Sequence, residues 1–194
     1  GSTYTLRDGG MSPNGLWLNV WNGFGSSGVE YVNGNYVFFE EPRAPRGGNS
    51  HSVLVVGTQK FQDHEISLDV KTVKQLRTRQ NPRPWEVAWL LFRYTDTSHY
   101  YYFILKTNGV ELGKKDGSSA QVFLYTANQP TLQIGSWSHW HIRVVGNHIT
   151  ISVNGVQVID FYDQGMSPQL SKGALGLYCE DSRVNFDNVY VAQL

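Results

Sequence analysis

The chain has 194 residues, enough for one sizeable hydrophobic core, and all-β sandwiches of this length are commonly single domains. Sixteen basic residues balance sixteen acidic ones, so the net charge is zero and a nucleic-acid partner, which usually needs a basic excess, is not expected. No apolar run is long enough to cross a bilayer. We therefore expect a single domain over residues 1–194, without a membrane span.

Two features of the sequence bear on the cellular compartment of the protein. Gly1-Ser2 is typical of the remnant that cleavage of a purification tag leaves, so the lack of a signal peptide excludes nothing. Cys179 is the only cysteine, which rules out an intrachain disulfide. In the segment GALGLYCED it alternates with Leu177, and this pattern indicates a buried small hydrophobic side chain.

Alternation of apolar and polar residues, the period of a half-buried β-strand, recurs along the chain. It is clear in EISLDVKT (65–72), whose apolar residues share one face. Asn-Gly pairs at 33–34, 108–109 and 154–155 separate such runs and predict type I′ hairpin turns, because both central residues need positive φ. About a dozen short strands at this spacing predict an all-β, two-sheet antiparallel sandwich.

Two stretches lack this regularity. EEPRAPRGGNSHS (40–52) and LRTRQNPRPWE (76–86) are rich in Pro, Gly, Asn and Arg, which predicts long loops. Long loops in a compact sandwich often carry function. Their arginines are equally compatible with plain solvated charge, so both interpretations stay open.

The segment from 85 to 106 holds two alternating strands, WEVAWLLFRYTD and HYYYFILK, which pair naturally across a short turn. One face of this pair suits the core. The opposite face is predicted to carry Trp89, Arg93, Tyr100, Tyr102 and Lys106, joined by Asp69 and extended by Glu111, Lys114 and His141. Flat aromatic faces and charged hydrogen-bonding groups suit sugars. Aromatic side chains also stabilise sheets by cross-strand pairing, so a purely structural face is the alternative.

The last third of the chain carries the most familiar pattern. A hairpin of the form G-x-W…I-x-V…G-x-x-I-x-V-x-V-N-G precedes a glycine-led strand and a closing F-D-N-V. Over residues 50–194 the order of elements resembles the concanavalin A-like lectin/glucanase superfamily. The resemblance is strongest to laminin-G-like and family 16 glycoside hydrolase-like domains, including those described as 3-keto-disaccharide hydrolases. It implies a jelly roll of two antiparallel sheets with glycans lying across the concave one.

The resemblance implies a carbohydrate-binding or carbohydrate-active extracellular module, secreted or on the cell surface, whose partner is a polysaccharide or oligosaccharide. The E-x-D-x-x-E strand of family 16 hydrolases is missing from the sequence. Its nearest counterparts, Glu65 and Asp69, lie about 13 Å apart along one strand, too far for a hydrolytic pair. A polysaccharide lyase or glycoside hydrolase on the same face is the alternative, and a protein-binding laminin-G-like adhesion module is the second. No residue is identified as catalytic.

The same resemblance implies a structural calcium ion. Many lectin-like jelly rolls hold one through oxygen ligands near the chain ends, and Asp187 in F-D-N-V matches the usual position of one ligand. A turn residue at a β-bulge is the other interpretation of Asp187.

Overall fold

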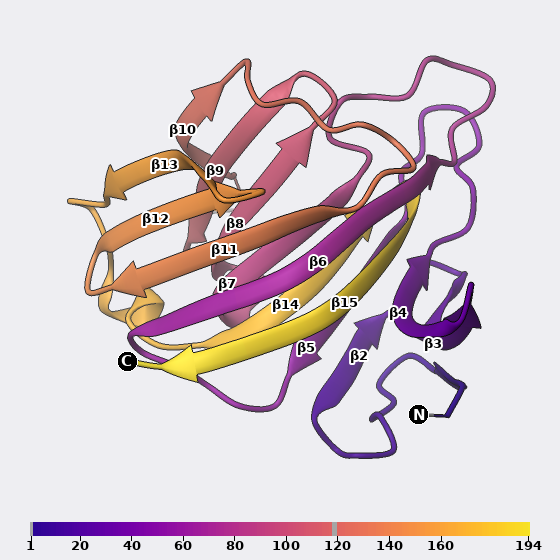
Figure 1. Ribbon diagram of the computed structural model, residues 1–194, viewed down its shortest axis with the longest axis horizontal. Helices are drawn as coiled ribbons and strands as arrows, with labels where there is room; N and C mark the ends of the chain where they lie inside the picture. The colour runs from indigo at the N-terminus through magenta and orange to yellow at the C-terminus, as the bar shows by residue number, and fades with distance from the viewer. Residues whose placement is uncertain (1, 118–119) are drawn as a thin grey trace.

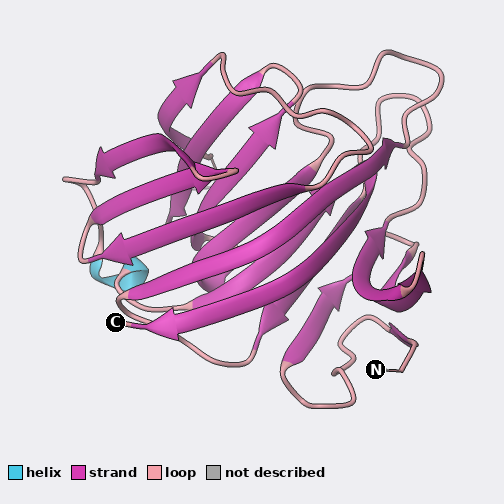
Figure 2. Ribbon diagram, in the orientation of Figure 1, coloured by secondary structure: helices cyan, strands magenta, loops and turns pink. Residues whose placement is uncertain are grey.

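The computed structural model describes residues 2–117 and 120–194 and shows two stacked antiparallel sheets (Figures 1 and 2). The eight-stranded sheet contains, in spatial order, β1 (Tyr4–Leu6), β3 (Ser26–Val32), β4 (Asn35–Glu41), β15 (Ser182–Gln193), β6 (His64–Gln75), β11 (Ser138–Val145), β12 (His148–Val153) and β13 (Val156–Tyr162). The seven-stranded sheet contains β10 (Val122–Ala127), β9 (Gly109–Asp116), β8 (His99–Lys106), β7 (Ala88–Asp96), β14 (Ala174–Glu180), β5 (Ser52–Gly57) and β2 (Trp17–Trp21).

The two-sheet jelly roll predicted from the alternation is therefore confirmed. The long strands β6 and β15 lie side by side across the eight-stranded sheet (Figure 1). One short 3-10 helix, η1 (Pro168–Leu170), is the only helix that the described residues form (Figure 2). None of the described residues belongs to a helix long and apolar enough to cross a membrane.

The hairpin turns follow the sequence signals at two of three positions. The pairs Asn33-Gly34 and Asn154-Gly155 have positive φ at both residues, as a type I′ turn requires. The prediction for 108–109 was wrong by one residue. Lys106 pairs directly with Gly109, so the turn consists of Thr107 and Asn108, and Gly109 opens β9 with a φ of 136°. A β-carbon at this glycine would collide with a backbone carbonyl at the end of β10.

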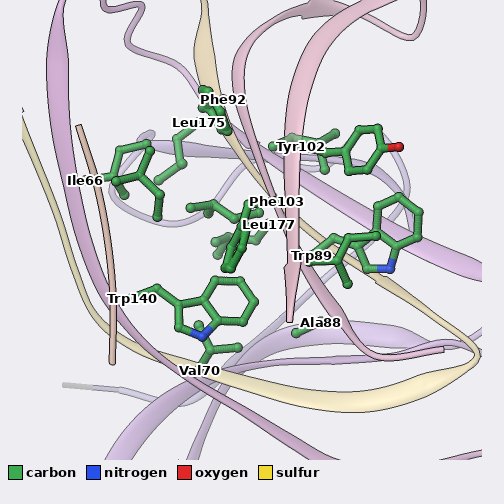
Figure 3. Packing of buried hydrophobic residues seen from close by; sticks show 14 of the residues in the cluster. Ile66, Val70, Ala88, Trp89, Phe92, Tyr102, Phe103, Trp140, Leu175 and Leu177 are labelled. Carbon is green, nitrogen blue, oxygen red and sulfur yellow. The ribbon is translucent and has the colours of Figure 1, made fainter. Parts of the chain in front are cut away.

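The hydrophobic core lies between the inner faces of the two sheets (Figure 3). Trp140 of β11 meets Phe103 of β8 edge-on, with 5.0 Å between the ring centroids, and its indole N–H donates to the hydroxyl of Ser138 at 2.9 Å. Figure 3 also shows the rings of Trp89 and Tyr102 directed away from this contact, toward the outer face of the seven-stranded sheet. The alternation of side chains therefore gives this sheet an aromatic outer face as well as an apolar inner one.

A buried carboxyl group lies inside the sandwich near the start of the chain. Glu40 of β4 is fully buried, and among the residues that the structure describes its oxygens have no nitrogen or oxygen hydrogen-bond partner and only the thiol of Cys179 beside them. Burial raises the pKa of the Glu40 carboxyl well above its usual value, because the interior disfavours the charged form. The pKa of the Cys179 thiol is raised by burial as well. Both groups are therefore held neutral.

Replacement of Glu40 by glutamine is expected to flatten the pH dependence of stability. Above about pH 4.3, the ordinary pKa of glutamate, the unfolded chain loses this proton while the folded chain keeps it. Stability then falls as the pH rises toward the folded-state pKa, by up to about 1.4 kcal/mol per pH unit. Urea denaturation of wild type and Glu40→Gln across this range measures the slope. An unchanged slope in the variant would contradict a neutral Glu40.

Candidate functional site

A cavity of about 580 Å³ lies on the outer face of the seven-stranded sheet. Its centre is one row of residues that face each other across neighbouring strands. The row contains Glu111 of β9, Trp89 of β7, Tyr178 of β14, Leu54 of β5 and Trp21 of β2, with Ile104 of β8 between the first two. Residues directly opposite each other in a ladder point to the same face, so register alone gathers these side chains.

The floor of the cavity is aromatic. The ring of Trp89 lies 5.1 Å from that of Tyr102 and meets that of Tyr178 edge-on at 5.2 Å. The indole N–H of Trp89 donates to the backbone carbonyl of Trp85 at 2.8 Å, which joins the floor to the loop at its rim. Trp85 itself is 39% exposed. The cavity therefore offers a fixed aromatic surface below and an accessible indole beside it.

A hydrogen-bonded polar group closes one end of the floor. The Glu111 carboxylate accepts from the Lys106 ammonium at 2.7 Å and from the Tyr102 hydroxyl at 3.1 Å. Burial raises the pKa of the Tyr102 phenol above its usual range, and the neighbouring Glu111 charge adds to the effect. Tyr102 is fully buried beneath the cavity, so it supports Glu111 and does not line the surface.

A second carboxyl, Glu180 at the end of β14, lines the same cavity. Burial raises its pKa, and the nearby Asp181 carboxylate raises it further. The Tyr178 hydroxyl donates to it at 3.4 Å. Glu111 and Glu180 stand on strands three ladders apart, so their backbones are about 14 Å or more from each other. Hydrolytic carboxyl pairs are about 5–10 Å apart, so this backbone spacing does not favour a two-acid hydrolase.

The two irregular stretches form the predicted loops, between β4 and β5 and between β6 and β7. A buried ion-pair network joins them. The Arg77 guanidinium donates to Glu86 and to Asp181, both at 2.7 Å, and also to backbone carbonyls of the 42–51 loop. All three side chains are at most 3% exposed. Arg77 is therefore not solvated charge, and it fixes the chain next to two of the cavity residues.

Of the residues predicted for this face, Trp89, Tyr100, Lys106 and Glu111 line the cavity, and Tyr102 lies beneath it. Lys115 lines the cavity in place of Lys114.

The placement of Lys114 was wrong because alternation along β9 turns it inward. Its ammonium donates to Asp163 and to the carbonyl of Gly165, both at 2.7 Å.

The placement of Arg93 on this face was also wrong. A β-bulge interrupts β7, and Arg93 has a φ of 49°. The alternation therefore breaks at this residue. Its buried guanidinium donates to the carbonyls of Gln62 and Gly146 at 3.0 and 2.7 Å and to Asp63 at 3.2 Å. Arg93 secures turns at the end of the sandwich.

Asp69 and His141 belong to the other sheet. Strand β6 pairs with β11 and β15, so its polar face is the outer face of the eight-stranded sheet. There Asp69 accepts from the His139 ring at 2.7 Å, and His141 lies 3.7 Å from Glu65. The prediction that these two residues join the aromatic face was wrong, because chain order does not determine which strands pair.

Several cavity residues were not predicted, chiefly Trp21, Trp85, Tyr178, Glu180 and Phe123. For Tyr178 and Glu180 a signal existed. Cys179 is fully buried, as its alternation with Leu177 predicted. The same alternation places the residues on either side of the cysteine on the outer face. Trp85 lies in a loop, where no periodicity operates.

Asp187 lies on the outer face of the eight-stranded sheet at a register shift in β15. One carboxylate oxygen accepts from the Asn35 amide at 2.6 Å and the other from the backbone N–H of Asn188 at 2.8 Å. Residues 2–117 and 120–194 hold no group of three or more His, Cys, Asp or Glu arranged for a metal. Calcium prefers six to eight oxygen ligands, so these side chains alone do not build its site. Calcium binding at Asp187 stays a prediction.

The stacked antiparallel sheets and their strand order define a jelly-roll β-sandwich. The model of the 3-keto-alpha-glucoside-1,2-lyase-like domain matches residues 11–192, and the chain belongs to this family. No curated protein matches the sequence.

Three solved structures share the fold at low sequence identity. The carbohydrate binding module CBM66 from Bacillus subtilis is 16% identical with a TM-score of 0.65, over 91% of this chain and 95% of that one. A Bacillus subtilis protein with a galectin-like fold is 14% identical with a TM-score of 0.64, over 100% and 96%. A Bacteroides ovatus GH16 protein in complex with a G4G4G3G product is 12% identical with a TM-score of 0.61, over 97% and 99%.

Gly113→Ala is expected to disturb the cavity floor. Gly113 of β9 faces Tyr102, and a β-carbon there would overlap the phenol ring and its hydroxyl. The ring would have to move and its hydrogen bond to Glu111 would break, so we expect a loss of about 1–3 kcal/mol in the free energy of unfolding. Urea denaturation measures it.

Gly57→Ala is the matched control, because a β-carbon at this strand glycine meets its nearest neighbour at 3.6 Å, an ordinary contact. We expect a change within about 0.5 kcal/mol for this control. Equal stability of both variants would show that Tyr102 is not held by its packing against Gly113.

Proposed function

We propose that the protein binds carbohydrate in the cavity over the seven-stranded sheet. The observation that carries this proposal is the row of Trp89, Tyr178 and Trp21 that ends at the Glu111–Lys106 pair within one cavity. Aromatic faces pack against the C–H faces of a pyranose, while a carboxylate and an ammonium bond its hydroxyl groups. A protein-binding module would instead present a flat apolar patch.

The comparisons support the same class of ligand. The name of the family refers to an alpha-glucoside. One structural neighbour is a carbohydrate binding module, and another is a GH16 protein in complex with a G4G4G3G product. These neighbours share the fold at low identity, so the residues of the cavity carry the argument for this chain.

Trp85→Ala tests the proposal. Its indole is the accessible one, and the hydrogen bond from Trp89 goes to its backbone carbonyl, so the floor stays intact in the variant. We expect wild type to be retarded in native gels containing at least one of starch, mixed-linkage glucan, xylan, alginate and pectin. The dissociation constant should rise about tenfold in the variant, the equivalent of about 1.4 kcal/mol of stacking.

Tyr190→Ala is the control, since Tyr190 is a 65% exposed aromatic residue of the eight-stranded sheet outside this cavity. In the polysaccharide-containing gels this variant should migrate at the same rate as wild type. Equal retardation of wild type and Trp85→Ala, or no retardation by any polymer, would contradict binding at this cavity.

A lyase reaction is the second candidate, favoured by Glu180 and by the family name. The raised pKa of Glu180 makes it a stronger base than an ordinary carboxylate. Elimination across C1 and C2 of a 3-keto-glucoside breaks the C2–H and C1–O bonds and forms a C1=C2 double bond. The proton taken from C2 is delivered to the departing oxygen, so neither oxidant nor reductant is consumed.

The product of this elimination is an enone, because the new double bond is conjugated with the 3-keto group. Its ultraviolet absorbance should rise when wild type is incubated with a 3-keto-alpha-glucoside. Glu180→Gln should lower the rate by about 10²–10⁴-fold while sugar retention persists. Absorbance that rises equally with the variant would remove Glu180 from the reaction. No rise with wild type would leave a binding module.

A further inference from the structure

A second cavity, of about 490 Å³, lies on the outer face of the eight-stranded sheet, on the side of the sandwich opposite the first. Its lining is mostly polar and comes from β3, β4, β6, β11 and β15, from the turns after β3 and β12, and from the chain before β11. The residues that matter here are Asn35, Asp69, Lys71, Trp137, Asn185 and Asp187. None of them lines the first cavity.

Two carboxylates face each other in this cavity. Asp187 of β15 and Asp69 of β6 are direct cross-strand partners, and His139 of β11 is the next residue in the row. Like charges directly opposite each other destabilise a sheet. Here the Asn35 amide donates to Asp187 at 2.6 Å and the Asn188 amide donates to Asp69 at 2.7 Å. The His139 ring lies 2.7 Å from Asp69. The row is thus a set of acceptors fixed at the sheet surface.

Asn185 is a side chain of this cavity whose hydrogen bonding is incomplete. It lies two residues before Asp187 and opposite Lys71, lines the cavity, and is 6% exposed. Its side-chain oxygen has no hydrogen-bond partner within residues 2–117 and 120–194. A buried amide without a partner is unfavourable, and rotation of the amide presents either a donor or an acceptor. A ligand hydroxyl group can act as either.

An exposed aromatic ring stands beside these polar groups. Trp137 is 44% exposed, and the Lys71 ammonium lies 6.0 Å from its ring centroid. An indole that is accessible on one side and flanked by amides, carboxylates and an ammonium combines a stacking surface with hydroxyl recognition. The lining carries two carboxylates, Asp69 and Asp187, against the one ammonium of Lys71, so its net negative charge selects against an acidic sugar.

We propose that this cavity is a second saccharide site, which binds a neutral sugar against Trp137 with hydrogen bonds to Asp69, Asn185 and Asp187. It stands on residues different from those of the first cavity and does not rest on sugar binding there. A chain with both sites holds sugars on two opposite faces.

The indole N–H signals of the six tryptophans give a direct test by two-dimensional NMR. Trp137→Phe identifies the Trp137 signal, and Trp85→Phe and Trp89→Phe identify two of the three tryptophan signals of the first cavity. The probes are glucose, galactose, mannose, xylose and fructose, with glucuronate as the acidic sugar. We expect the Trp137 signal of the wild-type protein to shift saturably with at least one neutral sugar and not with glucuronate.

Asp187→Asn keeps the size and polarity of the side chain. The dissociation constant obtained from the Trp137 shift should rise about tenfold in this variant. Tyr190→Ala, an exposed aromatic of the same sheet outside the cavity, should leave it unchanged. A Trp137 signal that no neutral sugar moves, or one that moves only with calcium chloride, would overturn the second site. Shifts confined to Trp85 and Trp89 would overturn it while supporting the first cavity. Shifts confined to Trp137 would support the second site and contradict sugar binding in the first cavity.

Discussion

The shape of the first cavity depends on the hydrogen bonds and ion pairs of the buried Arg77 guanidinium. It draws Glu86, Asp181 and the carbonyls of the 42–51 loop into one network, although these groups lie far apart in the sequence. Removing one partner of such a buried pair typically costs about 3–5 kcal/mol, because a charge is left without compensation. Trp85 and Glu180 immediately precede the two acids, so the rim of the cavity is built on an electrostatic anchor.

The sheets themselves provide the second constraint. Each cavity is centred on a row of side chains that the antiparallel register places directly opposite each other, an aromatic row on one sheet and an acidic row on the other. Since a shift of one residue would turn every side chain of a strand to the other face, the core that fixes the register also fixes both surfaces. Packing between the sheets therefore positions the candidate binding groups outside them.

Period-2 alternation explains how much of this could be anticipated. It correctly placed Trp89, Tyr100, Lys106 and Glu111 on one face, because strand periodicity is a local property. It failed at Arg93, where a bulge with positive φ breaks the period. Positive φ is usually signalled by a glycine, and the sequence has none at this position. It failed for Asp69 and His141 because strand pairing is decided by contacts distant in sequence. Trp85 reaches the rim through a loop that the Arg77 network shapes, and no periodicity describes that.

The single cysteine has a practical consequence. The Cys179 thiol is fully buried on the inner face of β14 beside the neutral Glu40 carboxyl, and burial keeps it protonated. A thiol reagent can reach it only when β14 separates from the opposite sheet, since the thiolate is the reactive form and needs access to solvent. The rate of Cys179 labelling therefore reports opening of the sandwich itself, and the chain carries its own probe of kinetic stability without any introduced label site.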